Sequence, residues 1–342
     1  MLVMRFFLVS LVVFLFCGCT NFQGAKALEF FSNIDKSGRW KTYNRADTEG
    51  RVLIGDVACL ESNLYVLDSA SGSMELKGSA KKCWDDFGIL IEHVVKDSSG
   101  EIIYAQKSET EKGYLLSRTV DNKVVSRRLS KKNVLQMTEQ GEDGSKIRAY
   151  TLSNDSGTVF KVQYQTDSND KMVAAKIIYP FTHRLNVEYD KDDSLVAISD
   201  ETNAERFRID FVNGPGKKYE EKVVYNGELY SYASKEMNAQ GRPLEVVFSD
   251  DFTGKQVHRK YAYTQDGRTA SIWENGVSRN LVYEGEKLVR EEYYNYAGKL
   301  FSVVDVVTDG VGNVVESSCA KGADGNTRRV TKQYRYTITY RQ

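Results

Sequence analysis

Proline and histidine are both scarce in this 342-residue sequence, with three of each. Scarce proline argues against a proline-rich disordered chain and leaves room for long strands. His93, His183 and His258 lie far apart, and none has a metal-ligand spacing, so we predict no metal site and no cofactor. An excess of charge of either sign is also missing, because 47 basic side chains stand against 47 acidic ones. The sequence therefore disfavours nucleic acid as a partner.

Long apolar runs are missing as well, except near the N-terminus. The run from Phe6 to Phe16 follows a short basic start that ends at Arg5, and small residues come next. A run of eleven residues is too short for a membrane-spanning helix, which needs roughly 20. This layout predicts an export signal over residues 1–18.

The residues that end this signal, Cys17-Gly18-Cys19-Thr20, resemble the bacterial lipobox. The resemblance implies that Cys19 is acylated and becomes the N-terminus, that residues 19–30 form a tether, and that the membrane is a partner through the lipid. Thr20 is not an Asp, so in a Gram-negative envelope the resemblance favours the outer membrane. The alternative is a plain secretory signal and a soluble product.

Three more cysteines follow Cys19, namely Cys59, Cys83 and Cys319. In an oxidising compartment two of them can pair. We predict a Cys59–Cys83 disulfide, because both lie in the N-terminal part and would close a modest loop. The alternative is that all three are buried free thiols.

Aromatic residues, by contrast, are plentiful, with 21 tyrosines and 15 phenylalanines. Apolar and polar residues alternate with a period of two, most clearly over 160–164, 185–189, 207–211 and 334–340. This period predicts strands with one buried face, and hence an all-β chain with a single short helix over 25–33. We expect an N-terminal β region over residues 31–150 and a C-terminal β-meander over residues 151–342.

Glycines recur in the C-terminal half at intervals of 9 to 14 residues, the spacing of hairpin turns. We therefore expect consecutive antiparallel hairpins that pack as a stacked sheet, a sandwich or an open half-barrel. A transmembrane barrel is the least favoured arrangement, because charged residues populate the strands. The glycines are Gly241, Gly254, Gly267, Gly276, Gly285, Gly298, Gly312 and Gly325.

Two segments of this half, Tyr261 to Arg268 (YAYTQDGR) and Tyr294 to Leu300 (YNYAGKL), resemble YD repeats of the Rhs type. Asn238 to Leu244 is a weaker copy, and the resemblance covers about residues 160–342. It implies stacked β-hairpins, and it transfers no activity.

Catalytic motifs are absent from the sequence, so we predict a protein that is not an enzyme. Asp190, Asp192, Ser194 and Glu201 match part of a calcium loop, but Leu195 replaces its glycine, which favours a hairpin turn. Neighbours on a strand point to opposite faces, and this leads us to expect an outward ring at Tyr293, as a contact surface.

The function expected is that of a membrane-anchored, non-enzymatic binding or scaffold protein of the bacterial cell envelope. Its partner would be a protein, a glycan or a lipid. One alternative is an envelope polysaccharide hydrolase with a hidden carboxylate pair. Another is a periplasmic carrier of lipids or lipoproteins, whose cavity needs only alternate apolar residues.

Overall fold

The structure is a computed structural model that describes residues 26–28, 30–31, 33–41, 45–123, 131–141, 145–204, 207–214, 218–225, 227–240, 242–250, 255–321 and 329–341. Outside a short helical stretch at residues 26–28 and 30–31, the regular structure of this part is β-strand. The strands are β1 (Val57–Leu67), β2 (Met74–Trp84), β3 (Leu90–Asp97), β4 (Ile102–Glu111), β5 (Tyr114–Asn122), β6 (Lys131–Gln140), β7 (Lys146–Asn154), β8 (Gly157–Thr166), β9 (Met172–Tyr179), β10 (His183–Tyr189), β11 (Leu195–Asp200), β12 (Phe207–Gly214), β13 (Lys218–Tyr225), β14 (Glu228–Met237), β15 (Pro243–Asp250), β16 (Lys255–Tyr263), β17 (Thr269–Glu274), β18 (Val277–Glu284), β19 (Lys287–Tyr294), β20 (Leu300–Thr308), β21 (Val314–Lys321) and β22 (Arg329–Tyr340).

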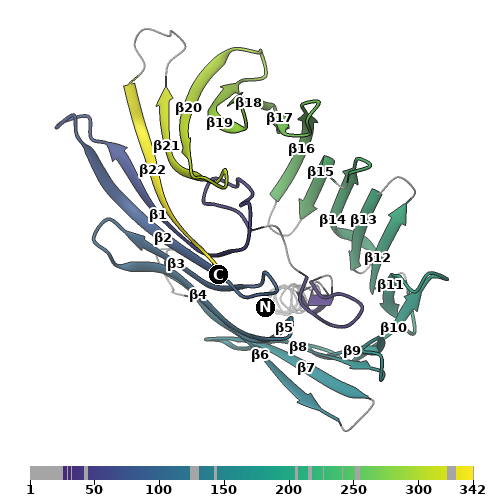
Figure 1. Cartoon of the computed structure of the whole chain (residues 1–342). Coiled ribbons are helices and arrows are strands. Elements are labelled where there is room, and N and C mark those ends of the chain that lie inside the picture. The colour runs from purple at the N-terminus through teal and green to yellow at the C-terminus, as the bar shows by residue number, and fades with distance from the viewer. Residues whose placement is uncertain are drawn as a thin grey trace, which may run out of the picture.

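These strands form one antiparallel sheet in which each strand pairs with the next along the chain. The first and last strands also pair, with Leu60 opposite Ile338 and Ser62 opposite Tyr336. The sheet therefore closes into a barrel, and Figure 1 shows β1 beside β22.

Closure corrects part of the fold expected from sequence. The antiparallel hairpins are present, but the stacked sheet, sandwich or open half-barrel is wrong, because β1 and β22 share a continuous ladder. Such a ladder leaves neither end strand with a free edge, which is the usual physical reason for a sheet to close. The boundary expected at residue 150 falls inside β7, and the sheet continues through it.

Several turns between consecutive strands, at both ends of the barrel, share one hydrogen-bond pattern. An Asp or Asn that ends a strand accepts hydrogen bonds through Oδ1 from the backbone N–H groups two and four residues later. Asp190 does so from Asp192 at 2.9 Å and from Ser194 at 2.8 Å. Asn295 repeats this with Ala297 and Lys299. The segment at Asp190 thus forms the hairpin turn that its sequence favoured, and the same pattern occurs at Asn238 and Asn295 in two of the YD-like segments.

The two faces of the sheet differ in how deeply their side chains are buried. On β8 the side chains of Val162 and Tyr164 are buried, whereas Lys161 between Phe160 and Val162 is exposed. Inward residues of β5 to β13 form one apolar cluster with the helical stretch, and a smaller cluster lies on β1, β2 and β20 to β22. The core therefore lies inside the barrel.

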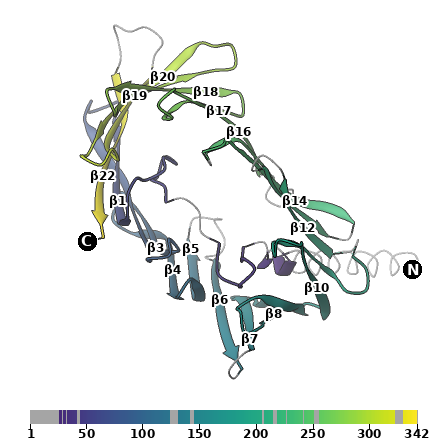
Figure 2. The same ribbon diagram turned by 45° about the vertical axis from the view of Figure 1, so that its right-hand side comes forward.

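Residues 33–41 and 45–56 lie in the interior, ahead of β1 in the chain, as Figure 2 shows. Ala27, Leu28 and Phe31 of the preceding helical stretch are fully buried in the larger cluster. Isolated bridges join Ile34 to Trp40 and Ala46 to Val52, so this part forms two small hairpins. The N-terminal segment fills part of the lumen and leaves the rest open.

Candidate functional site: the barrel lumen

The open part of the lumen is a cavity of about 2290 Å³ between the N-terminal segment and the inner faces of β13 to β19. This volume exceeds that of an ordinary small-ligand pocket, which is about 300 to 1,000 Å³. The cavity could therefore hold a large guest.

Apolar atoms make up more of the wall's surface than polar atoms do, although the lining also includes many charged side chains. Phe248 and Val257 stand opposite each other on β15 and β16, and Tyr261 stands opposite Ile272 on β16 and β17. Register puts these residues on the inner face in adjacent rows, since side chains across a ladder point to the same side. The wall therefore offers a guest apolar rows that are interrupted by charged side chains such as Arg259.

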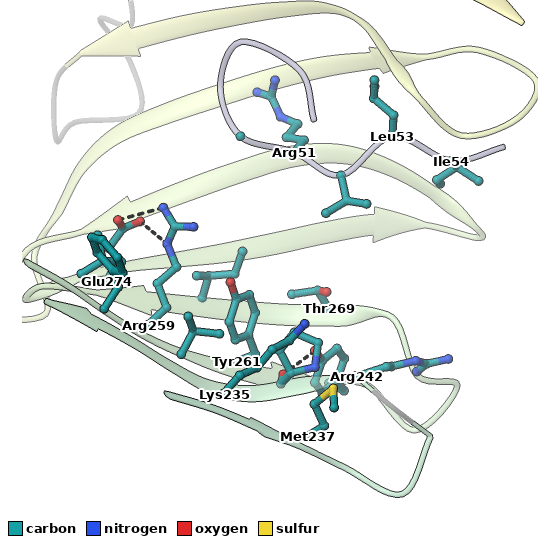
Figure 3. Close-up of a pocket in the computed structure, with 18 of the residues that line it drawn as sticks. Arg51, Leu53, Ile54, Lys235, Met237, Arg242, Arg259, Tyr261, Thr269 and Glu274 are labelled. Atoms are coloured by element: carbon teal, nitrogen blue, oxygen red, sulfur yellow. Dashed lines mark hydrogen bonds and ion pairs between the residues drawn. The ribbon is translucent and has the colours of Figure 1, made fainter. Parts of the chain in front are cut away.

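The charges on this wall are mostly paired. Arg259 pairs with Glu274 on the next strand, with Nε 2.9 Å from Oε2, and two of the dashed lines in Figure 3 join these side chains. Lys41 of the N-terminal segment lies 3.3 Å from the Glu221 carboxylate. Lys235 has no ion pair within the described residues, and it lies two residues before Met237 on the inner face of β14, as Figure 3 shows. Lys235 is thus available to an anionic guest.

At one mouth of the cavity, arginine side chains link neighbouring turns to each other. Arg242 donates to the Gly267 carbonyl, and Arg268 donates to the Gly285 carbonyl. Arg268 also lies over the Tyr283 ring, 4.7 Å from its centroid. Arg242 forms no ion pair in the part of the chain that the structure describes, so this mouth carries a cation near Lys235.

A buried charge cluster fixes the second hairpin of the N-terminal segment to the barrel wall. Arg51 donates to Glu291 at 2.8 Å and lies 2.9 Å from Asp47 and 2.7 Å from Glu49. Arg279 of β18 also pairs with Glu291, which is fully buried. Burial alone would raise the pKa of the Glu291 carboxyl, but Arg279 and Arg51 hold that pKa below its ordinary value. Glu291 is therefore ionised.

The outer face carries the charged side chains. A membrane-spanning barrel needs an outward apolar band about 25 Å tall and a polar interior. In the described strands of this barrel, charged side chains recur along the outer face and also line part of the interior, so the outer face does not match such an apolar band. Outward rows include Glu61, Lys81, Glu92, Lys107, Lys161, Arg184, Arg208, Lys222, Glu236, Lys260, Arg290 and Glu316. Among the described residues, no helix is long and apolar enough to cross a membrane.

The predicted cysteine pair is joined in the structure. Cys59 of β1 and Cys83 of β2 stand opposite each other and form a disulfide. Cys319 is a free, partly buried thiol. Cys19 and the expected signal lie outside the described residues, so lipidation stays a prediction.

The outward ring expected at Tyr293 is wrong. Tyr293 faces Arg279 across the ladder on the inner side, where its hydroxyl donates to Glu291 at 3.0 Å. Tyr294 takes the outward position on the same strand, and Tyr296 in the following turn is 92% exposed. The two adjacent tyrosines do point to opposite faces of the sheet, but the alternation of side chains along a strand does not tell which of the two faces is inside.

The lumen cluster around Arg51 was not found from sequence. Asp47, Glu49 and Arg51 lie in a segment without strand periodicity, and Glu291 is one of many charged residues on strands. No group of three or more His, Cys, Asp or Glu side chains within the described ranges could hold a metal ion. His93 is half-buried, and burial with the nearby Lys82 lowers its pKa to about 4.

No family model matches the chain, and no curated protein matches it. Among solved structures, a porin-like protein from Bacteroides uniformis ATCC 8492 aligns with 84% of this chain and 99% of its own, at 10% identity. The TM-score of that alignment is 0.26, too low to carry an argument, so the fold rests on the strand pairing of this chain.

Proposed function

We propose that this chain is an exported envelope lipoprotein whose barrel takes the apolar part of an amphiphilic molecule into its lumen. The observation that carries the proposal is the 2290 Å³ cavity, whose wall has more apolar than polar surface, inside a barrel whose outer face carries many charges. Burial of alkyl groups against such a wall contributes about 0.8 kcal/mol per CH₂ group. A long-chain amphiphile fits this lumen better than a small polar solute does.

The polar end of the guest would lie at the mouth near Lys235 and Arg242. Both cations lack an ion-pair partner among the described residues, and they lie at the same end of β14 and its following turn. An ionised lipid headgroup would find a charge partner there without displacing an existing salt bridge.

The proposed anchor would hold this lumen close to the membrane. Six residues separate Cys19 from Lys26, where the described chain begins, and a chain of that length spans at most about 25 Å. A lipid leaving the bilayer would therefore travel a short distance to reach the barrel. This proximity supports a carrier or lipid-binding function.

The hydrolase alternative receives less support from the site. A glycosidase needs one carboxyl group whose pKa is raised so that it can act as an acid. Every carboxyl with a shifted pKa in the described part of the chain has it lowered, as at Glu291, Asp200 and Asp309. The non-enzymatic function itself stays a proposal.

A fluorescent probe tests the lumen. N-phenylnaphthylamine should brighten on binding the purified protein, and oleate should displace it. Ile272→Asp puts a charge on the inner wall and should weaken probe binding by about tenfold, a change of about 1.4 kcal/mol. Val282→Asp adds the same charge on the outer face and should leave binding unchanged. Failure of the wild type to bind, or equal loss in both variants, would contradict the proposal.

Intact mass spectrometry of membrane-extracted protein tests the anchor. Wild type should have the mass of a chain that begins at an acylated Cys19, and Cys19→Ala should lose that mass and the membrane fraction. An unacylated mass in the wild type would refute the anchor and leave the lumen proposal standing.

A further inference from the structure

A second hollow lies on the outer face, away from the lumen. It has a volume of about 320 Å³ and is formed by β17, β18 and the end of β19 with its following turn. Trp273 stands opposite Ser278, and Ser278 stands opposite Tyr294, so these three side chains form one outward row across three strands. The hollow is lined by Trp273, Gly276, Ser278, Asn280, Tyr294, Asn295, Tyr296 and Gly298.

The row forms a groove with an aromatic side chain on each side and small residues at its base. Ser278 lies between Trp273 and Tyr294, and neighbouring strands are about 4.8 Å apart, so the two aromatic residues are separated by roughly 10 Å. Gly276 and Ser278 have little or no side chain to fill the gap. The space between the rings is wide enough for one flat, ring-shaped guest.

The groove is uncharged on a surface that otherwise carries many charges. Charged residues make up 27% of the chain, yet none of the eight lining residues is charged. Lys260 and Glu292 stand just outside it, on the same outward face. A guest that carried a charge would find no ion partner in the groove, so the lining favours a neutral one.

Two of the three aromatic rings, those of Trp273 and Tyr294, are partly exposed but held in place by neighbouring side chains. Trp273 is 37% exposed and packs edge-on against His258, with ring centroids 5.1 Å apart. The Tyr294 hydroxyl donates to Glu292 at 2.7 Å. Tyr296 is 92% exposed, which gives its ring no role in the core. Rigid, exposed aromatic rings bind partners at little entropic cost.

Two asparagine side chains add hydrogen-bonding groups to the groove. Asn280 makes no side-chain hydrogen bond within the described ranges. The Oδ1 atom of Asn295 accepts hydrogen bonds from backbone N–H groups of its turn, and its amide nitrogen has no acceptor among the described residues. Free amides between aromatic faces can bond hydroxyl groups, and the rings can stack on the C–H faces of a sugar.

We propose that this outer groove binds a neutral oligosaccharide, with one sugar ring between Trp273 and Tyr294 and with Tyr296 covering it. The site is separate from the lumen, and it does not depend on the lumen proposal. A surface polysaccharide of neutral sugars would be the natural source, because the barrel's outer face meets water.

Calorimetric titration of the full mature protein with maltohexaose, cellohexaose, xylohexaose and mannohexaose tests this proposal. At least one should bind, and Trp273→Ala should weaken that binding by about tenfold or more. Trp273→Phe keeps a ring and should retain part of the affinity. Tyr232→Ala removes an outward tyrosine of β14 outside the groove and should change nothing, with thermal melting used to show that each variant is folded.

Trp273 emission supplies a second readout, since the other two tryptophans, Trp40 and Trp84, belong to the interior clusters. The bound sugar should shift this emission. Binding of none of the four hexasaccharides, or binding that survives both Trp273→Ala and Tyr296→Ala, would overturn the proposal. Capture of a protein through Trp273 in the absence of any sugar binding would assign the groove to that protein instead and overturn it equally.

Discussion

At the scale of single residues, the Arg51 cluster shows how a charged side chain can be buried without destabilising the fold. Glu291 is fully enclosed, but it is contacted by Arg51, Arg279 and the Tyr293 hydroxyl. A buried charge without partners would be strongly unfavourable. The cluster therefore holds the N-terminal segment against β18 and β19 only while all its members are present.

Glu291→Gln should destabilise the protein markedly. The change leaves Arg51 and Arg279 buried without the carboxylate they share, and breaking a buried pair costs about 3 to 5 kcal/mol. Urea unfolding followed by circular dichroism gives the free energy of unfolding. Glu292→Gln, on the outer face of the same strand, should cost less than about 1 kcal/mol. Equal losses in the two variants would argue against the cluster's role.

The same carboxyl predicts a pH dependence. Because the folded pKa of Glu291 is below its ordinary value of 4.5, the unfolded chain binds a proton first as pH falls. The stabilisation from Glu291 should be fully present above pH 4.5 and should be lost as pH falls through the lower folded pKa. Unfolding free energies measured from pH 7 to pH 3 should therefore decline less steeply in Glu291→Gln than in wild type.

At the scale of elements, the β1–β2 hairpin carries a covalent link between directly opposed residues. Cys59 and Cys83 are 24 residues apart in sequence, and closing such a loop contributes roughly 3 to 4 kcal/mol on the chain-entropy model. The double variant Cys59→Ser, Cys83→Ser should lose about that much stability. Cys319→Ser should lose much less, and a free-thiol assay should find one reactive thiol in the denatured, unreduced mature chain if Cys19 is acylated.

The element scale is also where sequence reasoning succeeded. The segments 160–164, 185–189, 207–211 and 334–340 fall in β8, β10, β12 and β22, because a period of two reflects one buried face. Gly267, Gly276 and Gly298 adopt positive φ in hairpin turns, as their spacing suggested. Gly241, Gly254 and Gly325 lie outside the described residues.

At the scale of the whole molecule, closure could not be predicted from these local signals. It depends on the pairing of Val57 to Val66 with Lys332 to Tyr340, which are more than 260 residues apart. A pattern of alternation is the same in an open and a closed sheet. The lumen site was missed for a related reason, since Lys235, Arg259 and Ile272 come together only through the ladder of β14 to β17.

Removal of β22 tests closure. A chain that ends at Ala320 would expose the outer edges of β1 and β21, which now pair with β22. Unpaired edges recruit other chains, so this variant should aggregate on size-exclusion chromatography where the full chain elutes as a single defined species. A monodisperse, cooperatively folding truncation would contradict the account of closure.

Crystallography with a brominated amphiphile tests the central claim most directly. Crystals of the mature protein grown with 12-bromododecanoate should show anomalous density for bromine within the lumen, between Phe248, Val257 and Ile272, with the carboxylate directed towards Lys235 and Arg242. Density confined to the outer face, or an empty lumen at saturating amphiphile, would contradict the proposal that the barrel encloses an amphiphilic guest.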